Sequence, residues 1–241
     1  MNILVVNDDS IHSPGLALLA REAAKLGRVW VVAPASQCSA MSHRLSINAA
    51  LRVERAADFP APVEEAWSVS GTPADCVKVA LHYILKERPD YVFSGINDGY
   101  NVGFDIAYSG TLGAAMEAVM NGIPAIAFSN AMRYSLDLPQ AYLADIAREL
   151  MEKPLGPGKV WNVNFPEVTP GALRGIARDV SIANVQMYNE DYAEEVQADG
   201  SVILTGQSAP LGPDAEVPEG SDIDALRNGH ISIGWIKSAV M

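Results

Sequence analysis

Two acidic side chains stand next to each other where the first apolar run of the chain ends. The run from Ile3 to Val6 has no polar interruption and is typical of a buried strand, and Asp8 and Asp9 follow it. Two carboxylates this close repel each other unless a cation or hydrogen-bond donors compensate. A divalent metal ion is the simplest compensation, and the pair could then act catalytically on a bound anion. The alternative is that one of the two caps a helix that begins near Pro14, because Asp is a favoured cap.

Neutral oxygen donors follow two other predicted strands. Ser39 lies in the polar loop after the strand predicted for Val29 to Ala33, and Asn97 lies after a short apolar run that begins at Tyr91. In an open parallel sheet, ligands collect beyond the carboxyl ends of the strands, so these loops should converge. A set made only of oxygen atoms favours Mg²⁺ or Mn²⁺ over zinc. The candidate ligands of one divalent metal ion are therefore Asp8, Asp9, Ser39 and Asn97.

A third group of residues could hold a phosphate. Ser109, Gly110 and Thr111 stand at the start of a predicted helix. Free backbone N–H groups and the positive end of a helix dipole bind anions without Lys or Arg. This suits a chain with a formal net charge of −12. An ordinary Ser or Thr helix cap is the competing explanation. His43 could also bind phosphate or donate a proton, although a single histidine is more often a surface or core residue.

The elements that must position these residues alternate along residues 1–165. Short apolar strands are followed by helical segments with one apolar face, a pattern that predicts an α/β fold with a mostly parallel sheet covered on both faces. Residues 166–241 differ, because short strand-like pieces at 180–185, 202–204 and 230–236 are separated by Gly, Pro and acidic residues. We expect a single domain in which this β-rich extension serves in the pairing of subunits.

Composition narrows the classes of function. Of the 241 residues, 49% are hydrophobic and 19% are charged, so the chain can bury a large core. A formal net charge of −12 argues against a nucleic-acid polymer as partner, because binding to a phosphate backbone relies on clustered Lys and Arg. No apolar run approaches the length that spans a bilayer, so we expect no membrane insertion. Two cysteines and the lack of a signal segment predict a cytoplasmic location.

Other classes of protein also place an acid after the first strand. An aspartyl-phosphatase usually needs a second Asp two positions after its nucleophile, where this chain has Ser10 and Ile11. A phosphoacceptor signalling domain needs an Asp at the end of its third strand and a Lys near its fifth, where this chain has Ser94 and Ser129. Both classes therefore lack required residues. A nucleotide-binding sensor without turnover is a further alternative, against which the intact set of candidate metal ligands weighs.

Six motifs, taken together and in order, resemble the SurE family of 5′-nucleotidases. The likeness covers about residues 1–130, and Asn162 to Pro166 extends it. Any one motif alone would be weak, whereas six in the same order are highly specific. The motifs are Val6 to Ile11, the loop from Ala33 to His43, Gly71 to Cys76, Ser94 to Gly99 with Asn101 and Gly103, Tyr108 to Thr111 with Gly113 to Ala115, and Gly122 to Ala127.

The resemblance implies a Rossmann-like fold of three layers and hydrolysis of nucleoside 5′-monophosphates, with 3′-monophosphates as further candidates, by water that a divalent metal ion activates. It also implies a homodimer or homotetramer that acts on a small phosphomonoester. Carried over position by position, the catalytic acids are Asp8 and Asp9, and the residues beside the phosphate are Ser109, Gly110 and Thr111. The metal ligands of the family fall on Asp8, Asp9, Ser39 and Asn97.

The chain departs from the family pattern at three places. Ser10 stands where the family often has Gly, Ala40 replaces a glycine after Ser39, and Gly234–Trp235 replaces the usual Thr-Pro. These differences leave the candidate metal ligands intact.

Overall fold

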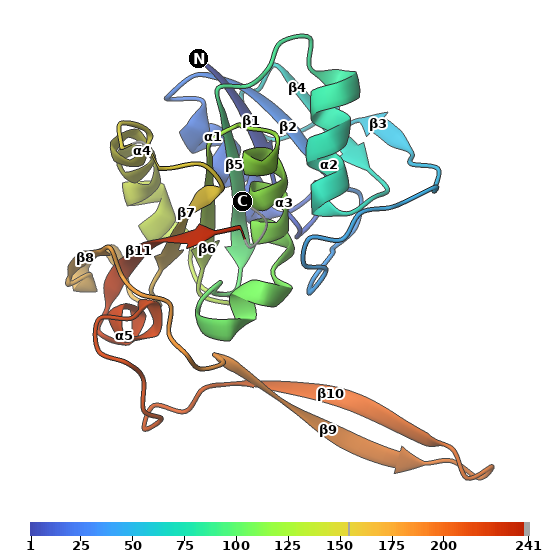
Figure 1. Cartoon of the computed structure of the whole chain (residues 1–241), viewed down its shortest axis with the longest axis vertical. Helices are drawn as coiled ribbons and strands as arrows, with labels where there is room; N and C mark the ends of the chain where they lie inside the picture. Colours follow the sequence, from blue (N-terminus) through green and yellow to red (C-terminus); the bar gives the residue numbers. More distant parts are fainter. Residues whose placement is uncertain (154, 239–241) are drawn as a thin grey trace.

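A mixed sheet of nine strands lies at the centre of the structure, a computed structural model that describes residues 1–153 and 155–238 (Figure 1). The strands follow the order β3-β4-β2-β1-β5-β6-β7-β11-β8. From β4 to β7 in this order they run parallel, whereas β3 and β11 run antiparallel to their neighbours β4 and β7. The mostly parallel sheet predicted from the sequence is confirmed. Its strands are β1 (Asn2–Val6), β2 (Arg28–Pro34), β3 (Val53–Arg55), β4 (Glu65–Val69), β5 (Tyr91–Asp98), β6 (Ala125–Asn130), β7 (Lys159–Phe165), β8 (Gly175–Arg178) and β11 (His230–Lys237).

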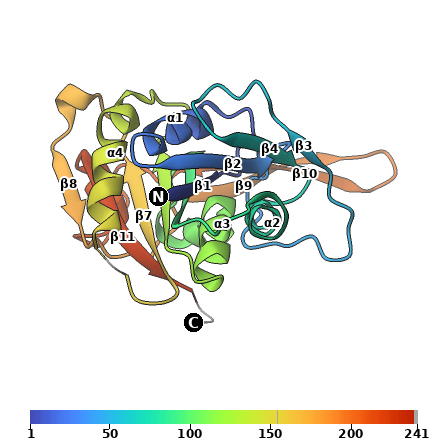
Figure 2. The ribbon, with the colours of Figure 1, turned by 90° about the horizontal axis from the view of Figure 1, so that it is seen from above.

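Helices cover both faces of this sheet (Figure 2). Side chains alternate along β1, so Ile3 and Val5 pack under α1 and α4, and Leu4 and Val6 pack under α2 and α3. The three-layer, Rossmann-like arrangement is confirmed. No helix in the described part of the chain has the length and apolar character needed to cross a membrane. The helices are α1 (Pro14–Ala23), α2 (Pro73–Val79), α3 (Gly110–Met120), α4 (Asp137–Met151) and α5 (Asp222–Arg227), with the short turns η1 (Ala80–Ile84), η2 (Gly103–Tyr108) and η3 (Pro170–Ala172).

Two of the helices that start near the carboxyl edge of the sheet, α1 and α3, have serine caps. The hydroxyl of Ser13 accepts the N–H of Leu16 at 3.4 Å at the start of α1, and Ser109 caps α3 in the same way. Since Ser13 caps α1, the alternative that Asp8 or Asp9 serves only to cap this helix is wrong. The acidic pair needs another explanation.

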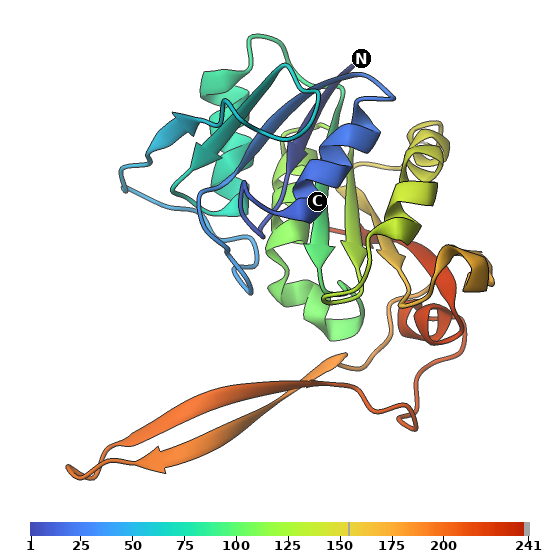
Figure 3. The ribbon, with the colours of Figure 1, turned by 180° about the vertical axis from the view of Figure 1, so that it is seen from behind.

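The C-terminal part of the chain is divided between the central sheet and a projecting hairpin. β8 and β11 join the sheet, whereas β9 (Tyr188–Val196) and β10 (Val202–Pro210) pair only with each other and extend away from the rest of the chain (Figure 3). Two of the predicted strand-like pieces, 202–204 and 230–236, lie within β10 and β11. The third, 180–185, forms only a single bridge between Ser181 and Ser221. The extra antiparallel strands of the extension are confirmed.

Candidate active site

The loop after β1 meets the loop after β2 and the first turn of α3. The backbone carbonyl of Asp8 accepts the N–H of Cys38 at 2.8 Å, and its carboxylate Oδ1 accepts the hydroxyl of Thr111 at 2.6 Å. Thr111 is fully buried, so water does not compete for this hydroxyl. The start of α3, where the sequence predicts a phosphate site, therefore lies beside Asp8.

Asp9 binds the end of β5 at the same edge of the sheet. Its Oδ2 accepts the N–H of Asp98 at 2.8 Å, and its Oδ1 accepts the side-chain amide of Gln37 at 3.2 Å. Together, Asp8 and Asp9 join the ends of β1, β2 and β5 to the start of α3. The parallel sheet thus brings its polar loops to one edge, where open α/β folds bind their ligands.

Within the described part of the chain, neither carboxylate has a cationic side chain as a partner. Among the residues that the structure describes, no Lys, Arg or His forms an ion pair with Asp8 or Asp9. Burial raises the pKa of Asp8 to about 7; the hydrogen bond from Thr111 lowers it in part, and the charge of Asp9 raises it. Burial also raises the pKa of Asp9, against the hydrogen bond from Asp98. A cation placed beside the pair would favour the ionised form of both.

Ser39, one of the two neutral candidate ligands, directly follows Cys38. Cys38 is buried and bound through its N–H to Asp8, whereas Ser39 is exposed. The Ser39 hydroxyl forms no hydrogen bond within the described ranges 1–153 and 155–238. It is therefore available to a ligand at the edge of the site.

Asn97, the other neutral candidate, lies in β5 one residue before Asp98. Its Nδ2 donates to the carbonyl of Gly99 at 2.8 Å, which leaves its Oδ1 as the atom that could bind a ligand. No group of three or more His, Cys, Asp or Glu side chains in the described part of the chain could hold a metal ion. A metal ion at this edge would therefore need neutral oxygens in addition to Asp8 and Asp9.

A glycine at the start of α3 permits the close approach of the helix to Asp8. A Cβ at Gly110 would lie 3.0 Å from Asp8 Oδ2 and 3.2 Å from the carbonyl oxygen of Cys38. Ser109 uses its hydroxyl as the cap, accepting the N–H of Leu112 at 3.1 Å. The first N–H groups of a helix have no partner within it, and the cap takes up that of Leu112, so the N–H groups of Gly110 and Thr111 are open to an anion next to Asp8.

His43 is engaged on the side of α3. Its Nε2 lies 2.8 Å from a carboxylate oxygen of Glu117, which is buried and also pairs with Lys78 at 3.2 Å. Glu117 stands about two turns along α3 from Ser109. The His43 backbone passes beside Gly113, while its ring contacts the body of the helix, and this contact helps to hold the loop after β2.

A cavity of about 400 Å³ opens beside Asp9. Asn97, Asp98, Arg133 and Tyr134 contribute to its walls. Arg133 is fixed by its backbone N–H, which donates to the Asp98 carboxylate at 2.5 Å, and its guanidinium forms no ion pair with any described residue. Sequence reasoning missed Arg133 and Tyr134, because they lie after β6 in a segment that no motif marks.

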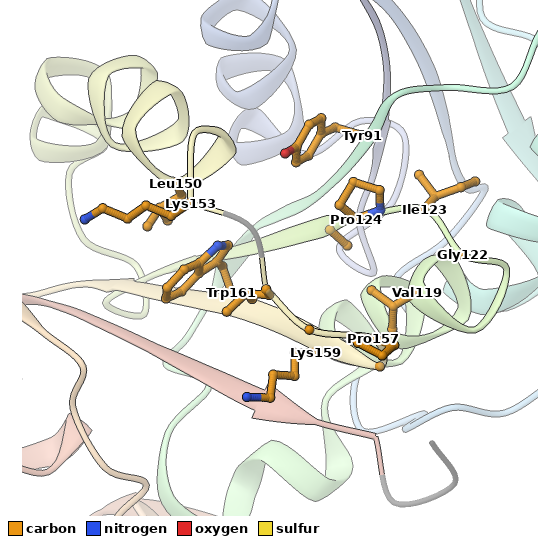
Figure 4. A pocket seen from close by; sticks show the side chains of 14 residues that line it. Tyr91, Val119, Gly122, Ile123, Pro124, Leu150, Lys153, Pro157, Lys159 and Trp161 are labelled. Carbon is orange, nitrogen blue, oxygen red and sulfur yellow. The ribbon is translucent and has the colours of Figure 1, made fainter.

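A second cavity of about 400 Å³ lies at the opposite, amino edge of the sheet, where the parallel strands begin (Figure 4). Apolar side chains and Trp161 form most of its walls, and no Asp or Glu is among the described residues that line it. Its cations are already engaged, because Lys159 lies 3.6 Å from the ring centre of Trp235 and Lys153 pairs with Glu149 at 2.6 Å. This cavity has neither the acids nor the free cations that phosphate chemistry requires.

Comparison with known proteins assigns the chain to a family. The family described as Survival protein SurE matches residues 3–190. The 5′-nucleotidase SurE of Moorella thermoacetica is 38% identical over 237 residues, covering 97% of this chain and 88% of the relative, and 5′-nucleotidase SurE 1 of Thermus thermophilus is 38% identical over 236 residues, covering 97% and 90%. The crystal structure of the SurE protein from Aquifex aeolicus aligns with a TM-score of 0.82 at 32% identity, covering 98% of this chain and 93% of that one. The chain belongs to the SurE family, as its six ordered motifs predict.

Proposed function

We propose that this protein is a 5′-nucleotidase that hydrolyses nucleoside 5′-monophosphates with the help of a bound divalent metal ion. The observation that carries the proposal is the position of Asp8 and Asp9, which have no cationic partner among the described residues and lie next to the start of α3. Acids that attract a cation and a helix start that attracts an anion together suit a metal ion and a phosphate. The curated relatives above carry the name 5′-nucleotidase, which supports this reading.

Oxygen atoms of four residues would hold the metal ion. Carboxylate, hydroxyl and amide oxygens are hard ligands, which suit Mg²⁺ or Mn²⁺ better than zinc. When bound, such an ion supplies positive charge to the phosphoryl oxygens and acidity to the attacking water. The four residues are Asp8, Asp9, Ser39 and Asn97.

Groups of the chain itself would complete the reaction. Asp8 or Asp9 orients the water that attacks phosphorus, because a carboxylate accepts a hydrogen bond from it. The backbone N–H groups of Gly110 and Thr111, after the cap Ser109, stabilise the negative charge on the phosphoryl oxygens. The hydroxyl of Thr111 also holds the Asp8 carboxylate in place at 2.6 Å.

The cavity beside Asp9 would take the nucleoside. Its volume of about 400 Å³ lies in the range of small-molecule sites. Tyr134 offers a ring on which a base could stack, and Arg133 offers donors to the base or the ribose. We extend the proposal to 3′-monophosphates, because the proposed phosphate contacts involve only the phosphoryl group.

A panel of phosphomonoesters tests the proposal. Phosphate release is measured from 5′- and 3′-nucleoside monophosphates and from p-nitrophenyl phosphate, with Mg²⁺, with Mn²⁺ and with chelator. We expect release that chelator abolishes and added metal restores. Asp9→Asn should lower kcat at least about 100-fold, more than the loss of an outer partner of a metal site causes. Asp145→Asn, at an exposed position of α4, is the matched control and should behave as wild type.

Two outcomes would count against the proposal. Full activity in chelator would exclude the metal ion from the reaction. Tight nucleotide binding without phosphate release would favour the nucleotide-binding sensor.

We also propose that the β9–β10 hairpin pairs subunits into a homodimer or homotetramer. A two-stranded sheet is at best marginally stable alone in water, and an exposed apolar patch marks an interaction surface. Replacing Val196 and Leu204 with Ser should give a monomer by light scattering, whereas an unchanged mass would rule this surface out. The register of the hairpin places Ile203 on one face and four of its exposed apolar residues on the other: Tyr192, Val196, Val202 and Leu204.

A further inference from the structure

The base of the β9–β10 hairpin is fastened to the segment that joins the two halves of the candidate site. This segment, residues 99–109, runs from the end of β5 to the start of α3. Asn97 precedes it and Thr111 follows it. The residues that bind it from the C-terminal part of the chain, 183–188, lead directly into β9.

Asp105, in η2, holds the hairpin base on the side of α3. Its Oδ2 accepts the backbone N–H of Met187 at 2.7 Å and that of Tyr188 at 3.0 Å. Hydrogen bonds to a carboxylate are stronger than those between neutral groups. The N–H of the neighbouring Phe104 donates to the carbonyl of Val185 at 3.0 Å. Three bonds thus fix η2, which leads into the cap of α3, against the hairpin base.

Tyr188 holds the same base on the side of β5. Its hydroxyl oxygen accepts the N–H of Tyr100 at 3.1 Å. A Cβ at Gly99 would lie 3.7 Å from this oxygen and 3.7 Å from Nδ2 of Asn97, so both side chains lie beside the peptide unit that joins Gly99 to Tyr100. Asn97 in turn donates to the Gly99 carbonyl at 2.8 Å. A continuous set of contacts therefore leads from Tyr188 to a candidate metal ligand.

A small apolar core stiffens this connection. Gly103 has a φ of +53°, and a Cβ there would overlap the carbonyl oxygen of Val185, so the approach requires glycine. The carboxylate of Asp222, in α5, accepts the N–H groups of Gly103 and Ala183, each at 2.9 Å. The buried members of this core are Val102, Ala183, Ile223 and Leu226.

We infer that Asp105 and Tyr188 are positioning residues for the hydrolysis, although neither belongs to the proposed metal or phosphate contacts. Asp105 acts through η2 on the first turn of α3, whose Thr111 holds Asp8. Tyr188 acts through the backbone at Gly99 on Asn97. The inference rests on the proposed function of this site. By this inference the hairpin base supports the active site, independently of any role in assembly.

Kinetics of matched variants test the inference. Asp105→Ala should lower kcat about 10- to 100-fold with little change in KM, because small displacements of positioned groups cost this much. Asp105→Asn keeps an oxygen acceptor and should recover most of the loss. Tyr188→Phe removes one acceptor and should lower kcat about 2- to 5-fold. Asp199→Ala removes a hairpin carboxylate that bonds only Ser201 among the described residues, and should leave kcat and KM unchanged.

Amide hydrogen exchange gives a readout that needs neither metal nor substrate. In Asp105→Ala we expect faster exchange in the first turn of α3 and at residues 99–101, while Asp199→Ala exchanges as wild type does. If Asp105→Ala does not fold, Tyr188→Phe carries the test, with faster exchange expected at residues 99–101. Faster exchange confined to residues 185–190, with wild-type kcat per folded molecule, would overturn the inference. A wild-type protein without nucleotidase activity would instead overturn the proposed function, and the exchange pattern would still decide the coupling.

Discussion

The carboxyl edge of the central sheet, where the parallel strands end, and the amino edge, where they begin, each carry a cavity of about 400 Å³. The two edges differ in their charges. At the carboxyl edge, Asp8 and Asp9 have no cationic partner among the described residues, and the start of α3 lies against them. At the amino edge, Lys153 and Lys159 are each engaged by a neighbouring side chain. Volume alone does not separate the two places, whereas unbalanced charge does. In this fold, unbalanced charge marks the candidate for chemistry.

The largest expected effect tests that unbalanced charge. The pKa of Asp8 rises from its ordinary value of 3.8 to about 7 on folding, so between these pH values the folded protein binds more protons than the unfolded chain. Without metal, the contribution of Asp8 to the free energy of unfolding should therefore be greatest below pH 3.8 and fall as the pH rises toward 7. The fall should reach at most about 4 kcal/mol.

Urea denaturation in chelator, repeated across this pH range, measures the effect as the difference between wild type and Asp8→Asn. The variant should lack the contribution of Asp8 to the slope, and Asp145→Asn should keep it. An identical slope in wild type and Asp8→Asn would show that Asp8 does not contribute the unbalanced charge by which the two edges are distinguished.

Closing the gap between α3 and Asp8 should have the next largest effect. Gly110→Ala places a methyl group 3.0 Å from Asp8 Oδ2, and should lower kcat about 10- to 100-fold by displacing the helix start. Gly156→Ala, at the amino edge, has no atom within 4 Å of the new Cβ and is the matched control. Thermal unfolding shows whether a lower kcat comes from the displaced helix start or from loss of the fold. Wild-type kinetics in both variants would show that the contact at Gly110 does not matter.

The smallest expected effect compares the walls of the two cavities. Arg133→Ala should raise the KM for a nucleoside 5′-monophosphate about 10-fold, because it removes charged hydrogen-bond donors from the proposed nucleoside site. The KM for p-nitrophenyl phosphate, which has no nucleoside, should stay unchanged. Lys159→Ala, in the other cavity, should alter neither. An equal rise of the KM for both substrates in Arg133→Ala would indicate that this side chain binds the phosphate and not the nucleoside.

Patterns within single elements could be predicted from the sequence. The aliphatic run from Ile3 to Val6 forms a buried strand, and Ser13 and Ser109 cap the helices that follow them, because these features depend on neighbouring residues alone. The order of strands and helices then indicates a parallel sheet, and such a sheet gathers its polar loops at one edge. This is why Asp8 and the start of α3 could be expected to meet.

Contacts between distant segments could not be predicted in this way. Asp98 binds Asp9, and Glu117 engages His43, because the folded chain brings them together, and no spacing in the sequence marks either pair. The strand β9 was missed for a different reason. Its Glu and Asp residues disfavour strands, and it forms because β10 pairs along its whole length.

Metal binding tests the central claim most directly, namely that Asp8 and Asp9 hold a divalent ion. Mn²⁺ is titrated calorimetrically into chelator-treated wild type, Asp8→Asn, Asp9→Asn and the control Asp145→Asn. We predict one bound ion per chain in wild type and in the control, and an affinity at least about 100-fold lower in the other two. Wild-type affinity in Asp8→Asn and Asp9→Asn would contradict the claim.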